Sequence, residues 1–263
     1  MAVVRPGDVH EPPDGSAVSA PELLRSTWTV VFARAGTLVL ITAACLLPGT
    51  LLANAARRVA APNDDLIAIL SIAVHLIGTY LAHTGITQVV VAHLRGEPPL
   101  APMQVLGQAV LRVVPALITG LAALLATLLG LLLFVVPGVI VWLTLFAAVP
   151  AAVIEHMGPL AAMRRSADLT HGSRGAIALA TLALVATFIV LLSCGCSVVA
   201  CFTLTQEAPS ELPPLVQVFV VILNLASQGF LIVGLAALSA VFYARARGLR
   251  ERIDADDVAE TFS

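Results

Sequence analysis

Long apolar stretches alternate with short polar ones along this chain of 263 residues. About 20 apolar residues in a helix suffice to cross the hydrocarbon core of a bilayer, which is about 30 Å thick. Membrane-spanning β-strands would instead show segments of about ten residues with alternating polarity, and the sequence has no such pattern. It therefore predicts an all-α polytopic membrane protein with six transmembrane helices. The predicted spans are 36–56, 66–92, 110–135, 138–154, 175–203 and 214–244.

The composition agrees with this prediction. Charged residues make up 11% of the chain, against about 25% in soluble domains, and the mean hydropathy is +0.98. Residues 1–20 contain Pro, Gly and acidic residues but not the apolar run of a signal peptide, so we expect a disordered cytoplasmic tail. Residues 21–250 would form the six-helix transmembrane domain, and residues 251–263 a cytoplasmic C-terminal tail.

The arginines predict an orientation, because positively charged residues gather on the cytoplasmic side of membrane helices. With the N-terminus in the cytoplasm, twelve of the fourteen arginines fall on that side, and only Arg57 and Arg58 fall on the other. Both termini are therefore expected in the cytoplasm, and the chain in the plasma (inner) membrane. The absence of Lys from the sequence is typical of GC-rich coding and indicates a bacterial source.

The polar stretch 155–174, "EHMGPLAAMRRSADLTHGSR", is predicted to hold a short helix over 159–171. Pro159 is tolerated in a first helical turn, and Gly172 can adopt the left-handed conformation that follows many helices. Leu160, Met163 and Ala167 share one face, whereas Arg164 and Asp168 form an i, i+4 pair on another. Such an amphipathic helix lies in the membrane interface.

Two other segments resemble this one. Residues 21–36 and 159–175 each have an Arg-Ser pair, a second Arg nine residues later and then an apolar span, and 102–117 is a weaker copy. We expect three parallel units, each a cytoplasmic amphipathic interfacial helix followed by a transmembrane hairpin. The alternative is that any helix skimming a bilayer shows Pro, Arg and Leu by chance.

The region around this helix resembles a known family. The residues concerned are Pro137, Gly138, Pro150, Glu155, Gly158, Pro159, Arg165, Ser166, Leu169, Thr170 and Gly172, together with the Tyr-x-x-x-Arg step of the last span. They are similar to bacterial integral membrane domains, including the membrane domain attached to some glycerophosphoryl diester phosphodiesterases. The resemblance implies a six-helix membrane domain. It does not imply phosphodiesterase activity, which belongs to a separate soluble barrel domain.

Two spans carry polar residues four positions apart, which places them along one side of a helix. They are His75, Thr79, His83 and Thr87 in the second span and Asn224 and Gln228 in the sixth. Polar groups at this depth are costly unless they face protein or water. This polar seam is either a cavity that holds a head group, an ion or a proton path, or a set of hydrogen bonds that join helices.

The remaining polar residues favour structural roles. Glu155 lies closest to the hydrocarbon among the acidic residues, and we expect it to pair with Arg164, Arg165 or the amides that start the 159–171 helix. The run "SCGCS" around Cys194 and Cys196 is interpreted as small residues that permit close packing. No metal, cofactor or nucleic acid is expected. The interfacial motif comprises Glu155, Arg164, Arg165, Ser166, Asp168 and Arg174.

The functional prediction is a non-enzymatic integral membrane protein, because the sequence holds no phosphate-binding loop and no recognisable catalytic triad or metalloprotease motif. We expect a scaffold or accessory subunit that engages membrane lipids, a partner membrane protein or further copies of itself. The alternative is a transporter or lipid-translocating permease that uses His75, Thr79, His83, Asn224 and Gln228.

Overall fold

The computed structural model describes residues 18–59, 65–204 and 214–261, and every element in these ranges is a helix. Six segments are long and apolar enough to cross a membrane, so the prediction of an all-α polytopic membrane protein is confirmed. The helices are α1 (Ala20–Ala33), α2 (Ala35–Val59), α3 (Asp65–Leu94), α4 (Pro102–Leu133), α5 (Val135–Thr144), α6 (Ala148–Glu155), α7 (Pro159–Thr170), α8 (Arg174–Leu204) and α9 (Pro214–Thr261).

The predicted hairpins correspond to three pairs of packed helices, α2 with α3, α4 with α5, and α8 with α9. Three details differ from the prediction. The expected surface helix 102–117 is not separate but continues into the apolar stretch as α4. The fourth span is divided into α5 and α6. The last helix does not end near residue 244 but runs on to Thr261. A disordered tail was expected over residues 1–20, and residues 1–17 of it lie outside the described residues.

The helix that the polar stretch 155–174 predicts is present as α7. Gly158 precedes it in an extended conformation, and Pro159 is its first residue, where the missing N–H leaves no hydrogen bond unmade. After the helix, Gly172 has φ +86°, the left-handed conformation that glycine adopts without strain. The face that packs against protein consists of Ala162, Ser166, Leu169 and Thr170, whereas Leu160 is exposed.

The α2–α3 hairpin is close-packed because glycines remove side chains from the contact. A Cβ at Gly49 would lie 2.8 Å from the Cα of His75, and one at Gly78 would overlap the carbonyl oxygen of Cys45. Membrane helices approach closely where small residues line the contact. The two backbones therefore fix where the polar side of α3 points.

The α4–α5 hairpin turns at a single residue. Phe134 is extended, with φ −165° and ψ 158°, between the last residue of α4 and the first of α5. The predicted gap between the third and fourth spans, residues 136–137, lies in the first turn of α5 instead, where proline is tolerated. The two helices touch directly, because a Cβ at Gly130 would come within 2.9 Å of the Cα of Gly138.

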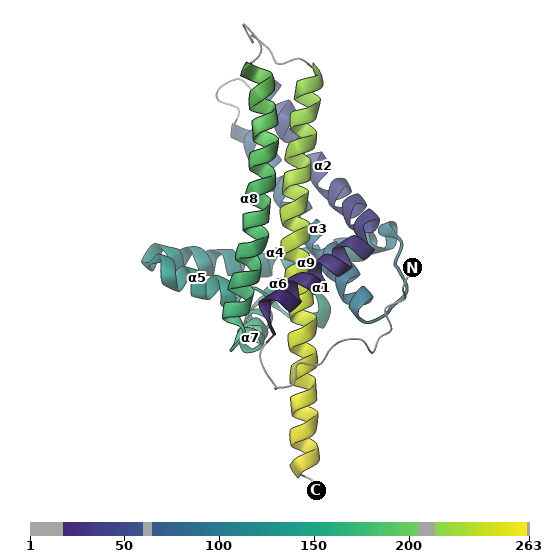
Figure 1. Cartoon of the computed structure of the whole chain (residues 1–263), viewed down its shortest axis with the longest axis vertical. Coiled ribbons are helices and arrows are strands. Elements are labelled where there is room, and N and C mark those ends of the chain that lie inside the picture. The colour runs from purple at the N-terminus through teal and green to yellow at the C-terminus, as the bar shows by residue number, and fades with distance from the viewer. Residues whose placement is uncertain (1–17, 60–64, 205–213, 262–263) are drawn as a thin grey trace.

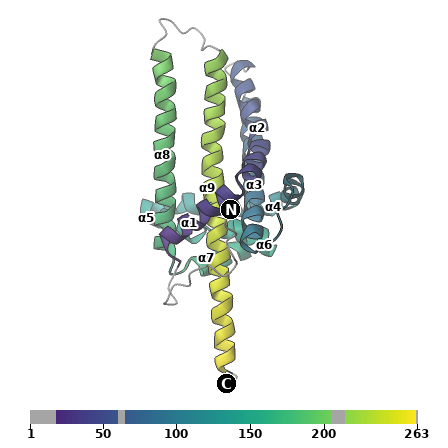
Figure 2. The ribbon, with the colours of Figure 1, turned by 45° about the vertical axis from the view of Figure 1, so that its right-hand side comes forward.

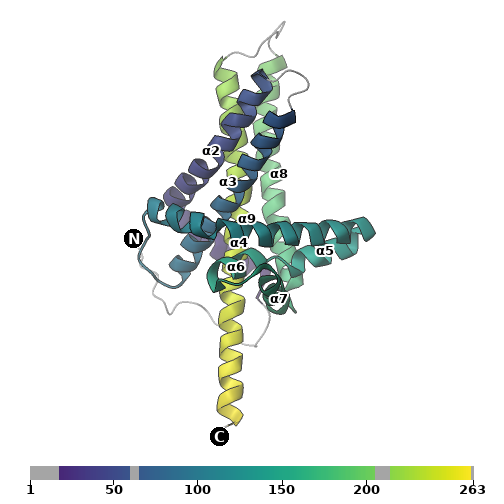
Figure 3. The same ribbon diagram turned by 180° about the vertical axis from the view of Figure 1, so that it is seen from behind.

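The helices form two groups that run in different directions (Figures 1 and 2). Helices α2, α3, α8 and α9 stand roughly side by side, and we call them the upright bundle. Helices α1, α4, α5, α6 and α7 lie towards one end of α2, α3 and α8, and we call them the cross layer. Figure 3 shows α4 and α5 running across the upright bundle and projecting beyond its side.

Buried side chains concentrate where the cross layer meets the upright bundle. Fully buried residues there include Leu23 of α1, Ile86 of α3, Val105 of α4 and Phe242 of α9. By contrast, the buried residues of α4 all lie between Val105 and Gly120. Its far half, which is capped by Phe134 at 75% exposure, protrudes from the core.

Candidate functional site

The structure brings four of the six predicted seam residues to one cavity. This cavity, of about 360 Å³, lies between α2, α3 and α9. Ligand pockets in proteins typically measure about 300–1,000 Å³. Its wall is formed by Thr50, Ala53, Ser71, Ile72, His75, Leu76, Thr79, Val221, Asn224 and Gln228. The sequence prediction that the second and sixth spans present their polar residues to each other thus has a counterpart here.

Hydrogen bonds inside the cavity leave part of its polar capacity unused. The Gln228 Nε2 donates to Asn224 Oδ1 at 2.6 Å, and the Thr79 hydroxyl donates to the His75 carbonyl at 2.9 Å. The Gln228 Oε1 is buried and accepts no hydrogen bond from any described residue. A buried acceptor without a partner costs about 1–3 kcal/mol, so this oxygen would gain from a donor in the cavity.

The other two seam residues lie outside the cavity wall, and the first of them is His83. It is two helical turns further along α3, towards the cross layer, and its Nε2 lies 3.5 Å from the Ser239 hydroxyl of α9. Thr87, one turn beyond, is buried and donates to the His83 carbonyl at 2.8 Å. The seam therefore divides into an open part at His75 and a packed part, where polar groups join helices.

At the other end of the upright bundle, Glu155 is the centre of a charged cluster. It accepts hydrogen bonds from Arg165 Nε at 3.3 Å and from the Tyr243 hydroxyl at 2.7 Å. The Arg247 guanidinium in turn donates to the Tyr243 oxygen at 3.3 Å. Of the partners expected for Glu155, the structure selects Arg165, and Tyr243 was not predicted. The cluster joins α6, α7 and α9.

Ser166 forms hydrogen bonds to the backbone at the break between α5 and α6. Its hydroxyl donates to the carbonyl of Thr144 at 2.8 Å and accepts from the N–H of Ala147 at 3.1 Å. Thr170 donates to the same Thr144 carbonyl at 3.2 Å. These are backbone groups that a helix break leaves without partners, and Ser166 is fully buried. The sequence singled out Ser166 but gave no sign of this contact, because the partners lie about 20 residues away.

The other residues of the interfacial motif take no part in these two sets of contacts. Arg164 and Asp168 are both exposed on α7, and the ion pair expected between them stays a prediction. Arg174 begins α8, and its Nε has no hydrogen-bond partner among the described residues.

Several of the arginines that predict the cytoplasmic side also join helices of the cross layer to their neighbours. Arg245 of α9 pairs with Glu22 of α1 and donates to Ser26 at 2.6 Å. Arg112 of α4 donates to the Val153 carbonyl of α6 at 3.2 Å. Simple counting of arginines could not identify these contacts, because each one joins residues far apart in sequence.

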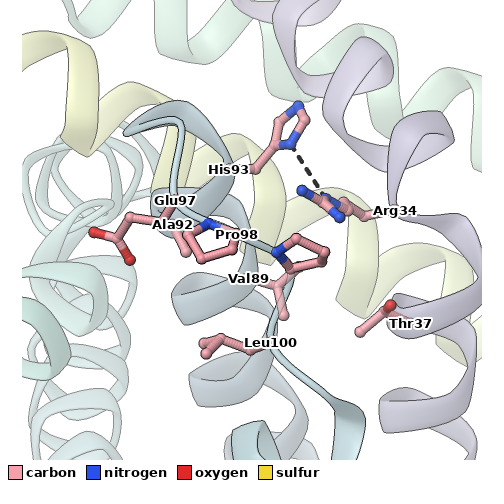
Figure 4. Close-up of a pocket in the computed structure, with 9 residues that line it drawn as sticks. Arg34, Thr37, Val89, Ala92, His93, Glu97, Pro98 and Leu100 are labelled. Carbon is pink, nitrogen blue, oxygen red and sulfur yellow. Dashed lines mark hydrogen bonds between the residues drawn. The ribbon is translucent and has the colours of Figure 1, made fainter.

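Arg34, where α1 ends and α2 begins, donates to His93 Nδ1 of α3 at 3.2 Å. Figure 4 shows the two side chains pointing towards each other beside Thr37, Val89 and Leu100. The hollow that these residues line measures about 10 Å³, which is room for about one water molecule. We interpret it as a packing defect.

No group of three or more His, Cys, Asp or Glu residues in the described part of the chain is placed to hold a metal ion. The side chains of Cys194 and Cys196 lie outside the described residues. Comparison of the chain with protein-family models, with curated proteins and with solved structures finds no match. The resemblance to the glycerophosphodiesterase membrane domain stays a prediction.

Proposed function

We propose that this chain is a non-enzymatic membrane scaffold or accessory subunit that engages lipid through its cross layer. The observation that carries this proposal is the course of the α4–α5 hairpin. It runs across the upright bundle and projects from its side (Figure 3). If the upright bundle stands along the membrane normal, this hairpin lies along the membrane plane, within the leaflet that contains α1 and α7.

The apolar surface of the α4–α5 hairpin supports the proposal that lipid surrounds it. The sequence holds no charged residue between Arg112 and Glu155, and Leu132 and Phe134 at the turn are 82% and 75% exposed. Exposed apolar surface of this extent in a membrane protein faces lipid or a partner protein. At about 1.5 Å per residue, residues 121–133 of α4, which lie beyond its last buried residue, reach about 20 Å, so the hairpin displaces lipid beside the bundle.

The charges support an orientation with the cross layer towards the cytoplasm. Arg34, Arg112, Arg165 and Arg245 all make their contacts in or beside this layer. Positively charged residues favour the cytoplasmic side. We therefore place the protein in the plasma (inner) membrane of a bacterium, with both termini in the cytoplasm. A partner membrane protein or a second copy could contact the projecting hairpin.

Reconstitution tests the proposal. The purified chain, in vesicles of phosphatidylethanolamine and phosphatidylglycerol, is expected to leave the flux of entrapped solutes and of labelled lipids equal to that of protein-free vesicles. Robust flux by the protein alone would contradict the scaffold and favour a transporter.

The second candidate is a transporter or lipid-translocating permease, and the cavity between α2, α3 and α9 favours it. In that case His75→Ala and Gln228→Ala abolish flux while the abundance of the protein stays unchanged, because both side chains line the cavity. Thr187→Val is the control, since Thr187 lies exposed on α8 and bonds only within its own helix among the described residues. If the two cavity variants merely lower the folding yield, the polar seam is structural.

A further inference from the structure

We propose that the cavity between α2, α3 and α9 binds the head group of a neutral, hydroxyl-bearing lipid such as a monoacylglycerol. The site lies apart from the cross layer on which the scaffold proposal rests. Its wall comes from the half of each helix that is remote from that layer, with Thr50 and Ala53 in α2, Ser71 to Thr79 in α3, and Val221 to Gln228 in α9. Binding there does not require transport.

The polar groups of the cavity are matched to a hydroxyl. Thr79 directs its own hydroxyl at a carbonyl of its helix, so it offers mainly acceptor capacity. The Gln228 Oε1 is buried without a donor, and the His75 ring makes no hydrogen bond with any described residue. The Asn224 amide nitrogen remains a donor while its oxygen is occupied by Gln228. A hydroxyl, which donates and accepts at once, can satisfy both kinds of group.

The charge of the wall argues for a neutral head group. None of the ten wall residues is Asp, Glu, Lys or Arg. Among these described wall residues a phosphate would find no fixed positive partner, and unpaired charges in the membrane interior are costly. A glycerol or alcohol head group brings no such penalty.

The shape of the cavity argues for a lipid rather than a small soluble molecule. Ile72, Leu76, Ala53 and Val221 supply apolar wall beside the polar groups. Ile72 is 67% exposed, so the cavity communicates with the hydrocarbon around the helices. A volume of about 360 Å³ accommodates a head group and the start of a chain, while the rest of the chain stays in the bilayer.

The end of the cavity towards the cross layer is closed. Beyond it, Ile41 and Leu46 of α2 and Ala82 and Ile86 of α3 are fully buried. A Cβ at Gly78 would overlap the Cys45 carbonyl, so the two helices leave no gap at this level. A ligand that enters from the lipid therefore stops at the polar groups.

Photo-crosslinking of the full-length protein in lipid nanodiscs tests the site. The probe is a monoacylglycerol that carries a diazirine near its head group, and labelled peptides are mapped by mass spectrometry. Labelling is expected on the wall segments 71–79 and 221–228. Unlabelled monoacylglycerol is expected to compete, whereas lysophosphatidic acid of the same chain length competes about tenfold less well.

Two variants and a control sharpen the result. Ala53→Phe fills the cavity and Gln228→Leu removes the unpaired acceptor, and each is expected to lower labelling about tenfold, as the loss of about 1.4 kcal/mol of binding would do. Ala186→Phe makes the same change at an exposed position of α8 and should leave labelling unchanged. Melting temperatures measured in parallel must stay near that of the parent protein for a variant to count.

Labelling spread equally over α8, insensitivity to Ala53→Phe, or equal competition by lysophosphatidic acid would overturn the proposal. Failure here leaves the scaffold proposal intact, since that rests on flux and on the position of α4–α5.

Discussion

At residue 155 a carboxylate interrupts the apolar pattern of the chain, and side chains from two other helices donate to it. Arg165 comes from α7 and Tyr243 from α9, so three helices meet at one acidic group. Only 12% of the Glu155 side chain is exposed. Hydrogen bonds to a charged group in such surroundings contribute about 1.5–3 kcal/mol, which is more than an exposed ion pair provides.

Glu155→Ala is therefore expected to lower the free energy of unfolding by about 1.5–3 kcal/mol, because it leaves Arg165 and the buried Tyr243 hydroxyl without their acceptor. The measurement is denaturant-induced unfolding in detergent micelles. Glu97→Ala is the matched control: its pair with Arg95 has both side chains about half exposed, and such pairs contribute about 0–1 kcal/mol. Equal losses in the two variants would show that the cluster does not anchor the cross layer.

Ser166→Ala tests the hydrogen bonds that Ser166 makes at the break between α5 and α6. The change leaves the Thr144 carbonyl with Thr170 alone and the Ala147 N–H with no partner, at an expected loss of about 1–3 kcal/mol in the same assay. Thr187→Val removes a hydroxyl that bonds only within α8 among the described residues, and is expected to change the stability by less than about 0.5 kcal/mol. If Ser166→Ala lowers the free energy of unfolding no more than Thr187→Val does, the contact of Ser166 with the break between α5 and α6 would be contradicted.

At the scale of helices, α4 shows how one element serves two surroundings. Its first half packs against α3, α6 and α7, while its second half pairs with α5 and is otherwise exposed. Gly120 marks the point where α4 crosses α3, because a Cβ there would overlap the ring of Tyr80. Close approach at a glycine is the usual way for membrane helices to cross.

Gly120→Ala is expected to destabilise the protein by about 1–3 kcal/mol, since the Tyr80 ring must move to make room. Gly107→Ala lies in the same helix with nothing near its Cβ, and should be neutral or stabilise by up to about 1 kcal/mol through helix propensity. Thermal unfolding of both variants decides the matter. A destabilising Gly107→Ala, or a neutral Gly120→Ala, would contradict the described crossing of α3 and α4.

The elements themselves are largely predictable from the sequence, for physical reasons. The length of an apolar stretch predicts a membrane helix. Gly158, Pro159 and Gly172 mark the ends of α7, because their backbone preferences are local. Four-residue spacing placed His75, Thr79, Asn224 and Gln228 along two helix sides that meet in one cavity. The division between α5 and α6 was missed, because residues 145–147 are as apolar as their neighbours and Ser166 supplies the missing partners from a distant helix.

At the scale of the whole molecule, the direction of a helix is what the sequence leaves open. Hydropathy measures the length and polarity of a segment, and α4 and α5 meet both criteria for a membrane span. Whether such a segment stands upright or lies across depends on contacts such as Gly120 with Tyr80 and Arg112 with Val153, which join distant residues. The structure lays the hairpin across the upright bundle (Figures 1 and 3).

The depth of Phe134 in the bilayer tests this account most directly. Spin labels on single cysteines at positions 134, 160 and 66 are compared by their exposure to lipid-soluble oxygen and to a water-soluble nickel complex. Leu160 lies on α7 in the cross layer, and Leu66 at the opposite end of the upright bundle; both are exposed. We predict that the label at 134 lies in the same leaflet as the label at 160. If the label at 134 instead lies at the interface marked by position 66, α4 crosses the membrane. That result would contradict the proposal that the α4–α5 hairpin lies along the membrane plane.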